Sequence, residues 1–141
     1  MAVDSSDNVY IGGYTCGNLT RVPNAGSYDI WLAKYDSSGT QQWIVQFGSS
    51  SYEELNAMAV DSSDNVYIGG QTYGALTGSN AGSNDIWYAQ YNSSGTQQWI
   101  MQFGTSSSDS LSAMAVDSND DLLIVGDTQG AFSGYDNSLT M

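Results

Sequence analysis

The chain has 141 residues, of which 15 are acidic and two are basic, and its formal net charge at neutral pH is −13. Such a charge repels phosphate backbones and anionic lipid, which argues against nucleic-acid and membrane-surface partners. With no histidine and only Cys16 as a thiol, the sequence also excludes intrachain disulfides, zinc sites built from soft ligands and histidine-based catalytic triads. No apolar run has the roughly 20 residues that a membrane helix needs.

The chain repeats its own sequence. The segment MAVDSSDNVYIGG at 1–13 returns unchanged at 58–70, and the related MAVDSNDDLLIVG stands at 114–126. A period of about 57 residues is close to the lengths that are typical of propellers, solenoids and other repeat arrays. We therefore divide the chain into a first repeat at 1–57, a second at 58–113 and a partial third at 114–141.

The first half of each repeat predicts a β-hairpin. In the second repeat, LNAMAVD starts at Leu55 and is followed by the turn DSSDN and by VYIGGQT. Alternating apolar and β-branched residues on both sides of an Asp/Ser/Asn cluster are typical of two antiparallel strands. The partial third repeat contains this first hairpin and little more.

The second half of each repeat predicts another hairpin. DIWYAQY at 85–91 and QQWIMQF at 97–103 flank the turn NSSGT, in which Gly95, like Gly39 in the first repeat, is expected to adopt a positive φ. The loops at 14–28 and 71–84, which join the two hairpins, differ most between the repeats, so ligand specificity is expected there. Each repeat is thus predicted to be four short antiparallel strands.

Apolar residues occupy both faces of the predicted strands. Trp31 and Ala33 point one way while Ile30 and Leu32 point the other, so the sheet needs cover on both sides, as in stacked blades. We expect the large aromatic rings to pack between blades, with sugar stacking at a loop-lined surface as the alternative. The predicted structural core consists of Trp31, Trp43, Phe47, Trp87, Trp99 and Phe103.

The two hairpin sequences together resemble a known repeat. AVDSSDNVYIGG, a Gly-rich loop and DIWLAKYDSSGTQQWIVQFG look like the bacterial and archaeal β-propeller repeat named for seven-bladed propellers, the SBBP-type repeat. AVDSSDNVYI also resembles NHL repeats, and AKYDSSGTQQW is similar to the tryptophan-docking motif of quinoprotein propellers. The resemblance implies an all-β fold with propeller-type blades.

Two features depart from that resemblance. The family usually has Gly where Asp7 and Asp64 stand, so Asn8 or Asn65 is expected to adopt the left-handed conformation instead. Propellers also close a ring with about four to eight blades, whereas this chain has about two and a half repeats. As a monomer it is therefore expected to be an incomplete propeller.

Two groups of side chains that carry oxygen atoms are candidate sites. The first-hairpin turns place side-chain oxygens at alternate positions, as a calcium loop does, but hairpin capping explains them without a metal, and no cofactor is expected. The calcium alternative would use Asp4, Asn8, Asp61, Asn65, Asp117 and Asp121. Glu53 and Glu54 are expected to be exposed neighbours in a polar loop and do not suggest the glycosidase pair of a carboxylic acid with a raised pKa beside an ionised carboxylate, so no catalytic residue and no enzyme activity are expected.

The unfinished stack favours a structural function. Open blade faces and strand edges are templates for another chain, so we expect an extracellular or cell-surface protein that assembles with itself, head to tail, as an oligomeric propeller or a filament. The alternative is a binding module of a larger closed propeller, in which the loops at 14–28, 71–84 and 127–138 recognise a carbohydrate or a surface protein. An enzyme on the same scaffold ranks third.

Overall fold

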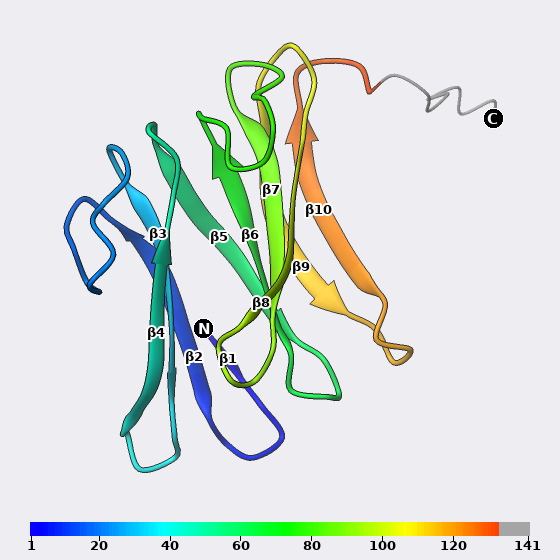
Figure 1. The fold of residues 1–141 in the computed structure, drawn as a ribbon. Coiled ribbons are helices and arrows are strands. Elements are labelled where there is room, and N and C mark those ends of the chain that lie inside the picture. Colours follow the sequence, from blue (N-terminus) through cyan, green and yellow to red (C-terminus); the bar gives the residue numbers. More distant parts are fainter. Residues whose placement is uncertain (133–141) are drawn as a thin grey trace.

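Residues 1–132 are described by the computed structural model, and they form three antiparallel sheets (Figure 1). The first sheet contains β1 (Ala2–Val3), β2 (Val9–Thr15), β3 (Asp29–Tyr35) and β4 (Gln41–Phe47). The second contains β5 (Glu53–Val60), β6 (Val66–Thr72), β7 (Asp85–Tyr91) and β8 (Gln97–Phe103). The third is the hairpin of β9 (Asp109–Val116) and β10 (Leu122–Thr128). The all-β expectation is confirmed, and no helix long and apolar enough to cross a membrane occurs in these residues.

The three sheets are stacked side by side as propeller blades that do not close a ring. In each sheet the strands follow one another in sequence order, and β5 lies against the first strand of both neighbouring sheets. Figure 1 shows the short hairpin turns at the lower end and the longer loops at the upper end. The boundaries between sheets fall in the segments 48–52 and 104–108, a few residues before the repeat boundaries that the sequence suggested.

The backbone conformations of the hairpin turns agree in part with those predicted from the sequence. Gly39 and Gly95 have φ values of 83° and 84°, as expected for the second-hairpin turns. The expectation for Asn8 and Asn65 was wrong, because the left-handed residues are their predecessors Asp7 and Asp64, each with a φ of 62°, and Asp120 in the third repeat has a φ of 64°. The reason lies in the turn itself: the Asn8 backbone N–H and side-chain amide both donate to the Asp4 carboxylate, so the chain must reverse one residue earlier.

The core lies between the first and second sheets. Its centre is Trp87, which is fully buried and whose indole N–H donates to the carbonyls of Glu54 and Gln71 at 3.1 and 3.2 Å. The Phe47 ring packs edge-on against Trp87 with ring centroids 5.7 Å apart. Trp43 is partly buried against the same cluster. The remaining buried members are Tyr10, Ile30, Leu32, Val66, Ile68, Ala89 and Tyr91.

Of the six aromatic residues expected in the core, only Trp87 is fully buried, and Trp43 and Phe47 are partly buried against the core cluster. Trp31 and Trp99 are half-buried, and Phe103 is 37 % exposed, which corrects its assignment to the core. Phe103 is the counterpart of Phe47, which β7 of the next sheet covers. Within residues 1–132 the third sheet has no strands equivalent to β7 and β8, so the Phe103 ring keeps an open side.

Candidate interaction surfaces

The third sheet ends in a strand with an unpaired edge. In the described part of the chain β10 pairs only with β9, whereas its counterpart β6 pairs with both β5 and β7. Leu123 and Val125 of β10 are among the exposed large apolar residues. An edge that carries free backbone groups and apolar side chains is a site for strand addition.

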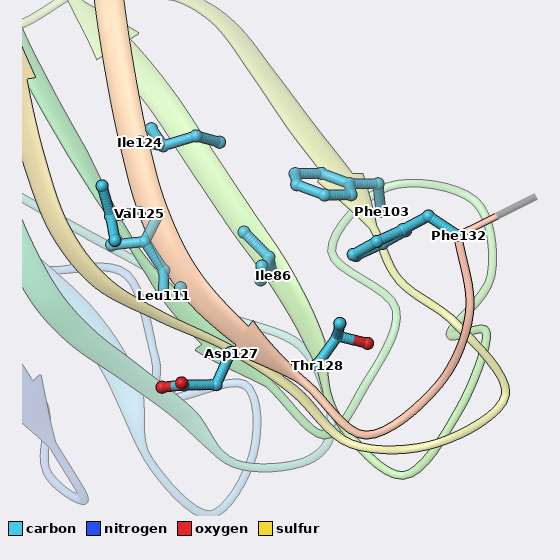
Figure 2. Close-up of a pocket in the computed structure, with 9 residues that line it drawn as sticks. Ile86, Phe103, Leu111, Ile124, Val125, Asp127, Thr128 and Phe132 are labelled. Atoms are coloured by element: carbon cyan, nitrogen blue, oxygen red, sulfur yellow. The ribbon is translucent and has the colours of Figure 1, made fainter. Parts of the chain in front are cut away.

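Two apolar depressions lie between β10 and the second sheet. The larger, of about 490 Å³, is lined by Tyr88, Trp99, Met101, Leu122 and Ile124. The smaller, of about 170 Å³, lies between Phe103 and Ile124, and Figure 2 shows the rings of Phe103 and Phe132 facing each other at its rim. Together they form an apolar face, here named the open face, which consists of the second-sheet residues Tyr88, Trp99, Met101 and Phe103 with the third-sheet residues Leu122 and Ile124.

The junction between the first two sheets shows what covers such a face. Phe47 contacts Trp87 and Tyr91 of β7, with ring centroids 5.7 and 6.1 Å apart. The Trp43 indole N–H donates to the Ser93 carbonyl in the β7–β8 turn at 3.1 Å. The second hairpin of the second repeat therefore covers the outer part of the first sheet.

Hydrogen bonds near the first-hairpin turns join successive sheets. Ser5 donates its backbone N–H and its hydroxyl to the Asp64 carboxylate at 2.9 and 3.0 Å. Ser62 makes the same two bonds to Asp120, at 2.9 and 2.5 Å. Within residues 1–132, Asp7 has no such donor and Ser118 no such acceptor, and both are exposed. The two ends of the stack thus carry complementary groups.

A cluster of four tyrosines lies at the loop end of the first junction. The Tyr28 and Tyr52 rings are 5.0 Å apart and nearly perpendicular, and Tyr14 and Tyr73 flank them. Tyr14 and Tyr73 are 46 % and 44 % exposed. At the second junction the corresponding positions hold the polar residues Gln71, Asn84, Ser108 and Gln129. Sheet stacking therefore does not require the tyrosines.

Hydrogen-bonding groups lie beside this tyrosine cluster. The Tyr52 hydroxyl donates to Glu54 Oε1 at 2.7 Å, and this bond, together with burial, raises the pKa of Tyr52 well above its ordinary value. Gln71 donates its amide to Glu54 Oε2, also at 2.7 Å. The sequence repeat does not single out these tyrosines, and the signal that could have identified them is that they occur only at positions where the repeats differ.

The calcium candidates form hydrogen-bonded turns. Asp4 Oδ1 accepts from the backbone N–H groups of Ser6 and Asn8 at 3.0 and 2.9 Å, and Oδ2 lies 3.0 Å from Lys34 Nζ. Asp61, Asn65, Asp117 and Asp121 belong to turns with the same backbone bonds to an aspartate. Among residues 1–132 no three His, Cys, Asp or Glu side chains are grouped so that they could hold a metal ion. The hydrogen bonds within these turns form without a metal ion, and calcium binding stays a prediction.

Glu53 and Glu54 are not exposed neighbours in a loop, as the sequence suggested, because both belong to strand β5, which directs their side chains to opposite faces. Glu53 is fully buried and accepts hydrogen bonds from Ser49 and Thr72, the latter at 2.9 Å. Glu54, the next residue of the strand, points to the other face and binds Tyr52. The two carboxylates therefore do not face a common space.

The single cysteine, Cys16, is exposed and forms no disulfide.

Comparison with known proteins agrees with this architecture. A family model described as a β-propeller repeat, SBBP, matches residues 42–76 and 98–133. The chain is also similar to the regulatory protein FlaEY of Caulobacter vibrioides, with 30 % identity over 111 residues, which is 73 % of this chain. It spans 11 % of the length of that protein. The similarity thus covers most of this chain but only a small part of FlaEY.

Proposed function

Because the chain belongs to the SBBP family of β-propeller repeats, we propose that it is a non-enzymatic structural protein of the extracellular space or cell surface. In this proposal its copies assemble head to tail, through the packing of one blade on the next, into an oligomeric propeller or a filament. It needs no cofactor, and its main partner is a second copy of itself. A surface rich in Ser, Thr, Gly and Asn with a net charge of −13 supports the location.

The observation that carries the proposal is the repeated serine-to-aspartate contact. The same pair of bonds joins the first sheet to the second and the second to the third, so it does not depend on where a sheet stands in the stack. One end of the stack offers the Asp7 carboxylate and the other offers Ser118. A second copy can therefore continue the stack with the bond that the chain already uses twice, which makes the contact heterologous.

The test is the mass of the protein in solution as a function of concentration. Light scattering coupled to gel filtration is expected to give species heavier than the 15.0 kDa chain, and their share should grow with concentration. Asp7→Gly should weaken association by roughly tenfold or less, because it removes an exposed charged acceptor while glycine keeps the positive φ. The matched control is Asp64→Gly, which removes an internal contact and should instead lower thermal stability. A single 15.0 kDa species at all concentrations would refute the proposal.

The tyrosine cluster favours carbohydrate binding as a second candidate function. Tyrosine rings offer flat apolar surface and hydroxyl groups together, and Glu54 and Gln71 beside them can exchange hydrogen bonds with sugar hydroxyls. The site lies at the loop end of the stack, where the sequence predicted specificity. Neutral oligosaccharides suit it better than acidic ones, because the chain is strongly acidic.

A glycan array followed by titration of the strongest hit tests this function. Tyr14→Ala and Tyr73→Ala should each weaken binding by about tenfold or more, since each removes an exposed ring from the cluster. Tyr35→Ala, on the opposite end of β3, serves as the control and should leave binding unchanged. Binding that is insensitive to both cluster variants would contradict the assignment.

A further inference from the structure

We propose that the chain pairs with a second copy of itself through the outer edges of β4 and β8, which join edge to edge as antiparallel strands. This contact differs from head-to-tail stacking, because it consists of backbone hydrogen bonds at the edge of a sheet and not of one sheet face packed on the next. The inference rests on the proposed self-association and names a second surface for it.

The free edges of β4 and β8 are a property of the complete repeats. Within residues 1–132, β4 pairs only with β3 and β8 only with β7. Each is followed in the sequence by a described strand, β5 or β9, that belongs to the next sheet. Backbone groups of an antiparallel strand point alternately to its two sides, so each outer edge offers a row of donors and acceptors to another strand.

The two edge strands lack the residues that usually prevent edge pairing. Natural edge strands commonly carry charged side chains or proline. β4 is QQWIVQF and β8 is QQWIMQF, and neither has a charged residue, a proline or a glycine. Every other described strand of seven or more residues contains a charged residue or a glycine. Uncharged, β-prone segments of this length are typical of strands that pair between chains.

A register shift limits the pairing to the second part of each edge strand. The partners of β4 shift between Lys34 and Tyr35 of β3, and β8 has the same shift opposite β7. A bulge of this kind bends an edge away from a flat approach. The regular edges are therefore residues 43–47 and 99–103, which have the length of an ordinary strand.

The regular edges are complementary to themselves. When two copies of 43–47 pair antiparallel about Val45, Trp43 of each copy lies opposite Phe47 of the other, and the two Val45 side chains face each other. Aromatic cross-strand pairs stabilise antiparallel sheets. All three side chains already pack against the core cluster of their own chain, so the face on which they lie is fixed before the copies meet. In β8, Met101 takes the place of Val45.

Charge favours a second copy as the occupant of these edges. The chain has a net charge of −13, so two copies repel each other over most of their surfaces. The uncharged strands β4 and β8 are where they can approach with the least repulsion. A basic partner would instead be attracted to the acidic turns, because the edge strands offer it no carboxylate.

The experiment is hydrogen exchange of the full chain at a series of protein concentrations. Exchange at the backbone amides of Gln41–Phe47 and Gln97–Phe103 should slow as the concentration rises, because pairing gives the outward N–H groups new acceptors. The central strand β6 is the internal control, since it has a hydrogen-bonded neighbour on both sides, and its exchange should change far less.

Two pairs of edge variants test whether the slower exchange comes from edge pairing. Ile44→Lys combined with Ile100→Lys places a charge in each regular edge and should weaken association by about tenfold or more. Both isoleucines are half-buried, so thermal unfolding verifies that this variant is folded. Gln42→Lys combined with Gln98→Lys changes exposed residues beside the edges, keeps the fold and should weaken association by a smaller factor.

The matched control is Leu19→Lys combined with Val22→Lys. It adds the same charge in the loop at 14–28, where the two side chains are 49 % and 54 % exposed, and association should not weaken. The control separates edge pairing from the general effect of a lower negative charge, which by itself would favour association.

Each outcome decides between the two contacts. Exchange in β4 and β8 that is independent of concentration overturns the inference, and so do folded edge variants that associate like the wild type. Association that is weakened by Asp7→Gly alone supports head-to-tail stacking and refutes edge pairing. Association that is weakened by the edge variants but not by Asp7→Gly supports edge pairing and refutes head-to-tail stacking.

Discussion

Trp87→Ala is expected to lower the free energy of unfolding by about 3 to 5 kcal/mol, the range for removing a large aromatic side chain from a packed core. Trp87 is fully buried at the junction of the first two sheets. It packs against the Phe47 ring and belongs to the same buried apolar cluster as Tyr10. Its loss also leaves the carbonyls of Glu54 and Gln71 without their indole donor. Both effects act on the contact that holds the stack together.

Chemical denaturation at neutral pH measures this cost, and Trp99→Ala is the matched control. Trp99 occupies the β8 strand of the same sheet but is only half-buried, because nothing in residues 1–132 covers its outer side. We expect the control to cost clearly less than Trp87→Ala. Equal losses for both variants would mean that the open face is covered in solution, and a loss below about 1 kcal/mol for Trp87→Ala would contradict the core assignment.

Most of the fold could be predicted from the sequence because repetition and alternation are local signals. The second hairpin of the second repeat was placed at 85–91 and 97–103, and β7 and β8 have these bounds. Alternation of apolar residues fixes which side chains share a face, since the strand period is two. The turn conformation was misjudged because the choice between Asp7 and Asn8 depends on which backbone N–H groups the Asp4 carboxylate binds, and composition does not reveal this.

The interaction surfaces were harder to predict because they depend on whether a neighbouring sheet covers a given strand. Phe47 and Phe103 occupy equivalent positions in nearly identical strands, yet one is covered by β7 and the other is exposed. The tyrosine cluster comes from four separate loop and strand ends, and only the stacking of two sheets brings it together. Sequence periodicity describes what the repeats share, whereas these sites arise where the repeats or their surroundings differ.

The second large effect concerns the buried ion pair of Asp4 and Lys34. Their side chains are 1 % and 10 % exposed, with Nζ and Oδ2 3.0 Å apart, and Nζ also lies 5.0 Å from the centre of the Tyr10 ring. Removal of one partner leaves the other charge buried, which typically costs about 3 to 5 kcal/mol. Lys34→Met should therefore destabilise the chain by about this amount. Lys34→Gln should cost less, because Gln90 occupies the equivalent position beside Tyr67 in the second repeat.

The pH dependence gives an independent check on the same pair. Burial alone would raise the pKa of Asp4, but hydrogen bonds from Asn8, Lys34 and Ser6 outweigh it and lower the pKa from 3.8 to about 2. Because the pKa is lower in the folded chain, the ionised carboxylate stabilises the fold above about pH 4, and this contribution is lost as the pH falls towards 2. A shift of this size corresponds to a contribution on the order of 2 kcal/mol.

Unfolding experiments on the wild-type chain and Asp4→Asn between pH 7 and pH 2.5 measure that contribution. The stability gap between them should narrow by on the order of 1 to 2 kcal/mol across this range, because Asp4 takes up a proton in the unfolded chain, where its pKa is near 3.8, before it does so in the folded chain, where its pKa is about 2. Asp36→Asn separates the lysine contact from the turn hydrogen bonds: bonds from Ser38 and Thr40 also lower the pKa of Asp36, but it lies in an exposed turn and binds no lysine, so its gap should narrow less. If the stability gap for Asp4→Asn stays constant down to pH 2.5, the contribution of Asp4 to the free energy of unfolding does not depend on its charge. The ion pair with Lys34 would then contribute little to stability.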